Sequence, residues 1–300
     1  MIIVIDESGS FSIKNDFNEK FKIQLFSAVF LNNKAEKKWI KKYSKIKKGF
    51  KHNENEASQI IKDLVLWKAK ALSVGTNLSL INRTTCVDFK KDFSESIISS
   101  IEKYPEHSKT AILEYVKKFE QLSLEESVKI LLLLQLLENA FREYFGSLDK
   151  LKSVDSRKLK IVIDSQSKPL LPFIHHFIHF YMFSKAIKKP IYSSSTKLIK
   201  SNHKLKDQDC LNLNEYTKKL KINSDDLRPV LKCADCIANF TRRTLIGNLQ
   251  FKGYEFLPEL YRNKYVPGLD LVHFNPNIDG DVFNKVPNEL IEACKYLGVM

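Results

Sequence analysis

The first thirty residues of the chain alternate between short hydrophobic runs and polar turns. Residues 2–5 are Ile-Ile-Val-Ile, the acids Asp6 and Glu7 follow them, and Ser8-Gly9-Ser10 comes next. A short run of Ile and Val indicates a buried strand, and Ser-Gly-Ser indicates its end. Residues 21–31 predict a second strand, antiparallel to the first through a hairpin-like return. Residues 73–82 predict a third strand.

Helical spacing dominates the other stretches of the first half. Residues 34–51 hold nine lysines and one acid, while Trp39 and Tyr43 recur at helical spacing, so one face packs and the other stays cationic. Asn53 is the predicted cap of a helix that runs to about residue 71. Residues 88–150 are predicted to be helical throughout, and 125–145 are apolar nearly all round, which indicates a buried helix.

The opening pattern returns near the middle of the chain. Residues 158–163 form a second apolar run, and it ends at an acid, Asp164. A helix predicted over residues 224–244 carries Asp235 among apolar and small residues, so we expect this acid on the packed face, where a carboxylate needs a partner. Between these two elements we expect a helix over residues 169–185 and a short strand over residues 190–196.

These elements predict an α/β protein in which a mixed sheet is flanked by helices. We expect a discontinuous core formed by residues 1–87 and 151–250, with residues 88–150 as a helical insertion. Residues 251–300, which are rich in Asn and Pro, are expected to form an irregular C-terminal segment packed on the core.

The amino-acid composition indicates the class of protein, its compartment and its partner. The chain of 300 residues is 43% hydrophobic and 28% charged, which is typical of a soluble globular protein. No apolar stretch reaches membrane-spanning length and the N-terminus has no signal pattern, so we expect a cytoplasmic protein without a membrane partner. Five cysteines without a disulfide-framework spacing suit a reducing compartment. The formal net charge of +14 favours nucleic acid as the partner.

Acidic residues stand where the predicted strands end and where a predicted helix begins. Asp6 and Asp164 end the two apolar strands, and Glu54 or Glu56 opens a helix. If the two strands are neighbours in one sheet, their terminal acids meet at one edge, where they repel each other unless cations neutralise them. Oxygen ligands select Mg²⁺ or Mn²⁺, and a pair of such ions activates water and stabilises the leaving oxygen of a phosphodiester. Together with Asp235 and the basic composition, this pattern predicts a metal-dependent nuclease.

Four short motifs, in their order along the chain, resemble a known family. They are Ile5-Asp-Glu-Ser-Gly9, Glu54-Asn-Glu-Ala-Ser-Gln-Ile60, the strand-ending Asp164, and Leu231-Lys-Cys-Ala-Asp-Cys-Ile-Ala238. These motifs are similar to those of prokaryotic proteins of domain of unknown function 3800 (DUF3800), which are grouped with ribonuclease-H-like folds. The resemblance implies a ribonuclease-H-like mixed sheet and acidic metal positions at Asp6, Glu54, Asp164 and Asp235. It also implies a setting in mobile elements or phage defence, in which a partner protein of the same system could complete the site.

Two positions depart from the pattern of that family. Its members often have His or Lys where Glu56 stands, and Gln where Lys232 stands. The first departure leaves open whether Glu54 or Glu56 is the ligand, and we favour Glu54 because Ala57-Ser58 sets the register. The second departure adds a cation near the proposed site. The candidates for binding substrate phosphate are therefore Lys232, Arg242 and Arg243.

Two other function classes fit parts of the same sequence. Asp6-Glu-Ser8-Gly-Ser10 fits the Asp-x-Ser-x-Ser pattern of von Willebrand A-type domains, in which the Asp and two hydroxyls hold Mg²⁺ for binding to a partner. In that fold a helix follows the motif directly, whereas here polar residues connect the motif to a predicted second strand. A catalytically silent nucleic-acid-binding protein is the other alternative, since the lysines could act without a metal.

Overall fold

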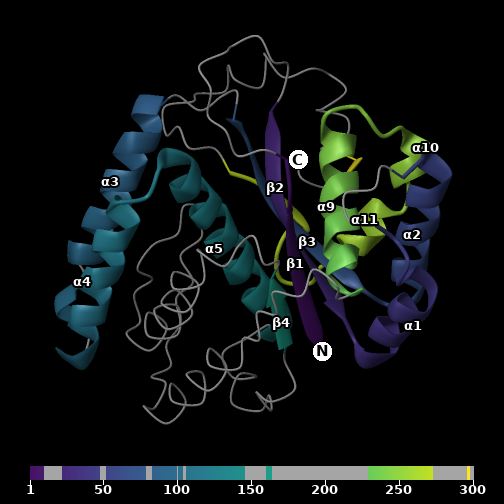
Figure 1. Ribbon diagram of the computed structural model, residues 1–300, viewed down its shortest axis with the longest axis horizontal. Coiled ribbons are helices and arrows are strands. Elements are labelled where there is room, and N and C mark those ends of the chain that lie inside the picture. Colours follow the sequence, from purple (N-terminus) through teal and green to yellow (C-terminus); the bar gives the residue numbers. More distant parts are fainter. Residues whose placement is uncertain are drawn as a thin grey trace.

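Five strands form one mixed sheet in the computed structural model, which describes residues 1–9, 22–47, 52–78, 83–99, 101–103, 106–145, 160–163, 229–272 and 296–297 (Figure 1). The strands are β1 (Ile2–Ser8), β2 (Ile23–Leu31), β3 (Lys70–Asn77), β4 (Lys160–Ile163) and β5 (Leu269–Leu271). Their order across the sheet is β4-β1-β2-β3-β5. The sheet and its helices confirm the α/β class. The expected helix over residues 169–185 and the expected strand over residues 190–196 lie outside the described residues.

Strand β1 has a neighbour on each side. It pairs antiparallel with β2, where Asp6 is in register with Ser27, and parallel with β4, where Ile5 is in register with Ile163. The antiparallel pairing confirms the hairpin-like return predicted from the sequence. The parallel pairing makes neighbours of the two strands that precede Asp6 and Asp164. The remaining pairs are β2 with β3, antiparallel, and β3 with β5, parallel.

Strand β3 begins earlier than expected because the helix before it stops early. Helix α2 (Glu54–Leu66) ends at the cap residue Trp67, whereas the sequence predicted a helix to about residue 71. Lys68 takes a left-handed conformation with φ of 59°, and the amide of Ala69 donates to the carbonyl of Leu64 at 2.9 Å. This bond and the left-handed residue close a helix C-terminus. Glycine usually supplies that conformation, so a lysine here gave no stop signal.

Helix α5 covers one face of the sheet, α3 packs against α5, and α4 packs against α3. Their bounds are α3 (Arg83–Ser99), α4 (Glu106–Glu120) and α5 (Leu124–Phe145), with a 3₁₀ turn, η2 (Ile101–Lys103), after α3. Helix α5 lies directly on β2 and β3, and its Leu132, Leu133 and Leu136 are buried in one cluster with Ile3 and Ile5 of β1. The predicted helical character of residues 88–150 is confirmed where these residues are described. The division into core and insertion stays a prediction, although α5 shares its hydrophobic core with the strands.

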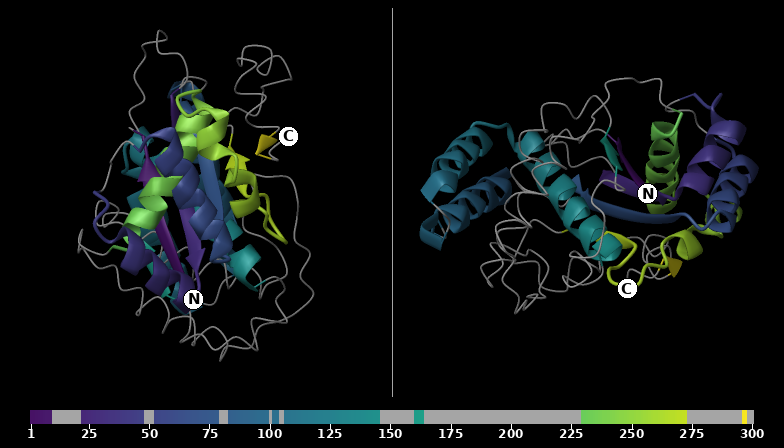
Figure 2. Two further views of the ribbon diagram at one scale, coloured as in Figure 1. Left: turned by 90° about the vertical axis from the view of Figure 1, so that its right-hand side faces the viewer. Right: turned by 90° about the horizontal axis from the view of Figure 1, so that it is seen from below.

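A second helical layer covers the opposite face. It consists of α1 (Asn33–Tyr43), α2, α9 (Leu231–Leu245), α10 (Phe251–Tyr254) and α11 (Leu257–Leu260). Ile2 and Val4 of β1 pack on this side, whereas Ile3 and Ile5 pack on the α5 side. Figure 2 shows the sheet between the two layers. Since successive side chains of a strand point to opposite faces, sequence position along β1 decides which layer each residue contacts.

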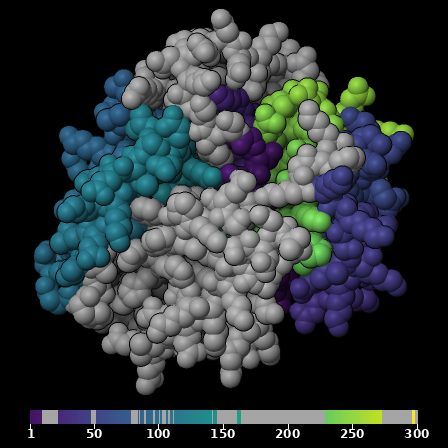
Figure 3. Space-filling model, viewed as in Figure 1, coloured from purple at the N-terminus to yellow at the C-terminus, as the bar shows by residue number. Residues whose placement is uncertain are grey.

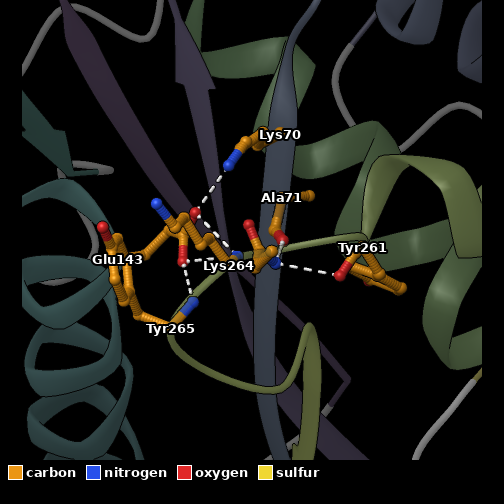
Figure 4. A network of polar contacts seen from close by, with 7 residues as sticks. Lys70, Ala71, Glu143, Tyr261, Lys264 and Tyr265 are labelled. Atoms are coloured by element: carbon orange, nitrogen blue, oxygen red, sulfur yellow. Dashed lines mark hydrogen bonds and ion pairs between the residues drawn. The ribbon is translucent and has the colours of Figure 1, made fainter. Parts of the chain in front are cut away.

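A buried carboxylate, Glu143 of α5, holds part of the C-terminal region against the sheet. It accepts hydrogen bonds from Nζ of Lys70 at 2.6 Å and from the amides of Lys264 and Tyr265 at 3.0 and 2.8 Å (Figure 4). Asn263 adds a side-chain hydrogen bond of 2.8 Å to the carbonyl of Ala71. The segment after residue 250 was expected to be irregular, but α10, α11 and β5 form within it. It is more regular than its composition indicated because α10 and α11 pack on α2, and β5 pairs with β3.

Glu143→Ala is expected to lower the free energy of unfolding by about 2–4 kcal/mol, because two backbone amides and the Lys70 ammonium lose a buried acceptor. The Glu143 side chain is 4% exposed, whereas that of Lys70 is 44% exposed, so water partly compensates the lysine. Urea denaturation followed by circular dichroism measures the change. The control is Glu114→Ala at an exposed position of α4, which should change stability by less than about 0.5 kcal/mol. Equal effects of the two substitutions would contradict the role given to Glu143.

Candidate functional site

Asp6 lies near the end of β1, on the face that α9 covers. It continues the alternation of Ile2 and Val4, which pack on this side. Asp6 is 2% exposed, and its Oδ1 accepts a hydrogen bond of 2.8 Å from the amide of Glu7. A carboxylate therefore sits among core side chains, where its negative charge needs donors or cations.

Glu7, the next residue, points to the opposite layer. Its carboxylate forms an ion pair with Lys129 of α5, in which Nζ lies 2.8 Å from Oε1 and 2.6 Å from Oε2. The two adjacent acids of the motif therefore enter different surroundings. Glu7 is neutralised on the α5 side, and Asp6 is the acid that faces α9.

Gly9 ends the motif in a backbone conformation that favours glycine. Its φ is +103°, and a Cβ at this position would lie 2.0 Å from Oε1 of the buried Gln24. Any other residue would strain the backbone and collide with the Gln24 side chain. The glycine after the two acids is thus required by the turn out of β1.

Helix α9 brings Asp235 into the neighbourhood of Asp6. The helix packs on β1 and β2, with Ala234 and Cys236 buried and Asp235 half-buried between them. Burial raises the pKa of the Cys236 thiol, and the negative charges of Asp235 and Asp6 raise it further. Both carboxylates therefore act on the same thiol. In Figure 3, purple atoms of the N-terminal strands are visible between α5 (teal) and α9 (green).

His52 belongs to the same neighbourhood, although the sequence analysis did not single it out. It is 6% exposed, and its Nε2 lies 3.8 Å from Sγ of Cys236. Its Nδ1 lies 3.5 Å from Oε2 of Glu56. Burial lowers the pKa of His52, while the negative charges of Glu56 and Asp235 act in the opposite direction. The i, i+4 spacing of His52 and Glu56 is the sequence signal that could have identified it.

The two glutamates at the start of α2 have different surroundings. Asn53 and Glu56 form a capping box, in which each side chain accepts a hydrogen bond of 3.0 Å from the other residue's amide. This confirms the predicted cap. Glu54 turns instead toward α10, where its Oε1 accepts from the amide of Gln250 at 3.1 Å and its Oε2 lies against Gly253. Glu56 thus lies beside His52, whereas the contacts described for Glu54 join α2 to α10.

Asp164, the remaining predicted ligand, lies outside the described residues. Strand β4 is described as far as Ile163, which is in register with Ile5. Asp164 follows Ile163 in the sequence as Asp6 follows Ile5. The strands are therefore neighbours, as expected, and the position of the Asp164 carboxylate stays a prediction.

The three cations predicted to bind phosphate each donate a hydrogen bond to a backbone carbonyl. The bonds are Lys232 Nζ to Ser44 at 2.9 Å, Arg242 Nε to Ile23 at 3.1 Å, and Arg243 Nη1 to His52 at 2.7 Å. These contacts fix α9 to its neighbours in the fold. Phosphate binding by the same side chains stays a prediction.

A row of buried hydroxyls continues from Asp6 across the sheet. Ser27, in register with Asp6, lies 2.5 Å from the hydroxyl of Ser73, which lies 2.7 Å from the hydroxyl of Tyr261. Tyr261 also bonds to Thr241 of α9. Burial raises the pKa of Tyr261 to about 12, so the phenol stays protonated. The interface between the sheet and α9 is therefore polar along one row and hydrophobic on both sides of it.

The donors of this site fit a hard divalent cation in their chemistry. Asp6 and Asp235 offer carboxylate oxygens, which Mg²⁺ and Mn²⁺ prefer, while burial keeps the Cys236 thiol protonated by raising its pKa. Among the described residues, no three side chains of His, Cys, Asp and Glu lie close enough together to hold one ion. A complete ligand set therefore needs a further residue, and Asp164 is the candidate from the sequence.

Comparisons with known proteins add no relative, because no family model, no curated protein and no solved structure matches the chain. None of the helices within the described ranges combines the length and the apolar character needed to cross a bilayer. The site residues themselves are therefore the basis for assigning a function.

His52 is expected to make stability fall on acidification. Because burial lowers its pKa below the ordinary value of 6.5, the unfolded chain binds a proton that the folded protein does not bind between the folded value and 6.5. The stabilisation is therefore complete above the unfolded pKa and is lost as the pH falls, by at most about 1.4 kcal/mol per pH unit. Thermal melts in chelator at about pH 7.5 and about pH 5.5 measure this change.

His52→Asn serves as the comparison in these melts. It removes the titrating ring and keeps the backbone carbonyl that accepts from Arg243. The variant should lose less stability than the wild type over the same pH interval. An equally steep loss in both proteins would show that other groups cause the pH dependence.

Proposed function

We propose that this protein is a Mg²⁺- or Mn²⁺-dependent nuclease that hydrolyses phosphodiester bonds of nucleic acid. The observation that carries the proposal is that Asp6, which is 2% exposed near the end of β1, and Asp235 of α9 both act through their negative charges on the buried thiol of Cys236. Carboxylates that meet at one site would repel each other, and a divalent cation would relieve that repulsion. This chemistry is expected of a metal centre more than of a hydrophobic core.

The proposed ligands are Asp6, Asp164 and Asp235, with a glutamate of α2 as the fourth. The register of Ile5 with Ile163 supports Asp164. The contacts of α2 favour Glu56 over Glu54, because Glu56 borders the His52 ring, on which Asp235 also acts. This choice reverses the preference that the sequence register alone supported.

Divalent ions bound at such carboxylates activate water and stabilise the leaving oxygen of a phosphodiester. The residues of the chain would hold and orient this centre. Asp6 is fixed by burial and by the amide of Glu7. Asp235 is half-buried, and α9 is held in place by the backbone hydrogen bonds of Arg242 and Arg243. A rigid first carboxylate and a partly open second one suit a centre that must admit substrate.

The finer fold assignment is part of the same proposal. The antiparallel pairs β1–β2 and β2–β3, with β4 parallel to β1, support a ribonuclease-H-like sheet of the DUF3800 type. With the motifs in the family's order, we extend the proposal to a cytoplasmic role in phage defence or a mobile element. A partner protein of the same system could complete the site. The net charge of +14 supports DNA or RNA as substrate.

The pairing of β1 with β2 favours the nuclease over a von Willebrand A-type binding module. In that fold a helix follows the Asp-x-Ser-x-Ser motif directly, whereas here β1 and β2 are antiparallel neighbours. Glu7, which stands between the Asp and the first Ser of that motif, forms an ion pair with Lys129. A silent nucleic-acid-binding protein has the same basic composition, so cleavage assays must separate it from a nuclease.

Asp6→Asn and Asp235→Asn are each expected to lower the cleavage rate at least about 100-fold, because each removes a charge that holds the metal. Labelled single- and double-stranded DNA and RNA, incubated with Mg²⁺, Mn²⁺ or chelator, provide the measurement. Binding in chelator should stay within about threefold of the wild type. Metal-free stability should be unchanged or higher, because one of two repelling charges is gone.

Asp88→Asn, an exposed position on α3, is the matched control and should leave cleavage unchanged. Full activity of both site variants would refute the metal centre. If the wild type binds nucleic acid in chelator but cleaves none of the substrates with either metal, the silent binding protein becomes the better description.

Glu56→Gln and Glu54→Gln are expected to differ in their main effect. Glu56→Gln should lower cleavage about 10- to 100-fold, with little loss of stability because glutamine also completes a capping box. Glu54→Gln should leave cleavage within about threefold and act mainly on stability through the contact with α10. Cleavage rates over a Mg²⁺ titration, together with thermal melts, separate the two. The opposite ranking would return the ligand role to Glu54.

A further inference from the structure

Helix α1 and the turn after it present a cationic surface outside the carboxylate site. Their exposed lysines are Lys34, Lys37, Lys38, Lys41, Lys45 and Lys47, and we call this set the lysine surface. With the described residues none of the six forms an ion pair, whereas the neighbouring Lys42 pairs with Asp63. Glu36 is the acid within the same stretch, and it is half-buried. The lysine surface is therefore a nearly uniform positive patch.

The opposite side of α1 explains why these lysines all face water. Ala35 and Trp39 are fully buried against the sheet layer, and Nε1 of Trp39 donates to the carbonyl of Pro229 at 2.7 Å. The apolar face of the helix is therefore occupied by the protein itself. An amphipathic helix that inserts into a membrane needs that face free, so this arrangement argues against a lipid surface as the partner.

The lysine surface adjoins the first turn of the helix that carries Asp235. Nζ of Lys232 donates to the carbonyl of Ser44, the residue after α1, at 2.9 Å. Together with the bond from Trp39 to Pro229, this contact joins the C-terminal end of α1 to the beginning of α9. An extended polyanion lying along α1 would thus reach α9 at the end where Lys232 and Asp235 stand.

We propose that the lysine surface binds the phosphate backbone of nucleic acid and leads it toward the end of β1, an inference that rests on the proposed nuclease function. Lysines without acidic partners bind phosphates with release of counterions, so each contact adds to affinity and to its salt dependence. Nζ of Lys38 also lies 5.9 Å from the centroid of the half-buried Trp67 ring, which keeps an aromatic face beside the cations. Such a mixture of cations and an aromatic ring suits a backbone track without base specificity.

The test is binding in chelator, without any readout of cleavage. Fluorescence anisotropy with labelled single- and double-stranded oligonucleotides, over a salt titration, gives the affinity and the slope of log K against log salt. Lys37→Glu/Lys41→Glu should weaken binding at least tenfold near 0.1 M salt and reduce the slope by about 2, since about 0.9 is lost per phosphate contact on duplex DNA. Circular dichroism and thermal melts confirm that the variant folds.

The matched control is Lys117→Glu/Lys118→Glu in the last turn of α4, which changes the net charge by the same amount. Figure 1 shows α4 and α1 at opposite sides of the molecule. The control should bind within about twofold of the wild type. Equal losses in both variants would mean that net charge alone attracts nucleic acid, and would overturn the proposal.

Two other outcomes would also overturn the proposal. One is that the wild type does not bind nucleic acid. The other is that it binds phosphatidylserine vesicles equally tightly and that Lys37→Glu/Lys41→Glu weakens both kinds of binding to the same degree. The outcomes are separable from those for the nuclease. If the wild type binds through the lysine surface but cleaves no substrate, the proposed surface is supported and the proposed metal centre is refuted. If the protein cleaves nucleic acid but Lys37→Glu/Lys41→Glu leaves its affinity unchanged, the proposed metal centre is supported and the proposed surface is refuted.

Discussion

The arrangement depends on one constraint, the alternation of side chains along a strand buried between two helical layers. Strand β1 is paired on both edges and covered on both faces, so its Ile and Val residues divide between two hydrophobic clusters. Because of this alternation, the Asp6 side chain faces α9 and the Glu7 side chain faces α5. A shift of register by one residue would exchange these surroundings. It would leave Glu7 among the groups of α9 and would bring Asp6 to Lys129.

The two acids are stabilised in different ways, and this difference gives the end of β1 its chemistry. Glu7 meets a lysine across the core, so its charge is neutralised within the protein. Asp6 shares its side of the sheet with a second carboxylate, a protonated thiol, a buried histidine and a row of hydroxyls. The α9 side is where the proposed divalent cation would bind, and the proposed nucleic-acid surface of α1 adjoins α9 at Lys232.

Several features could be predicted because they follow from local pattern. The antiparallel return from β1 to β2, the cap at Asn53 and the buried face of α1 all come from residue order and spacing. Other features had no local signal. The early end of α2 depends on a lysine in a left-handed conformation, which sequence rules assign to glycine. The regular structure after residue 250 depends on contacts with α2 and β3, which lie far earlier in the chain.

For the site, the sequence by itself determined which residue types stand at the ends of strands and at the start of helices, because hydrophobic alternation and turn residues are local properties. It thereby singled out Asp6, Asp164, Asp235 and the pair Glu54 and Glu56. Only the tertiary structure decided the surroundings of the described ones. Glu54 contacts the segment that begins α10 and Glu56 lies beside His52, while packing of α9 against β1 brought Cys236 under the influence of both Asp6 and Asp235. These outcomes depend on contacts between segments far apart in the chain, and the pattern within any one segment carries no information about them.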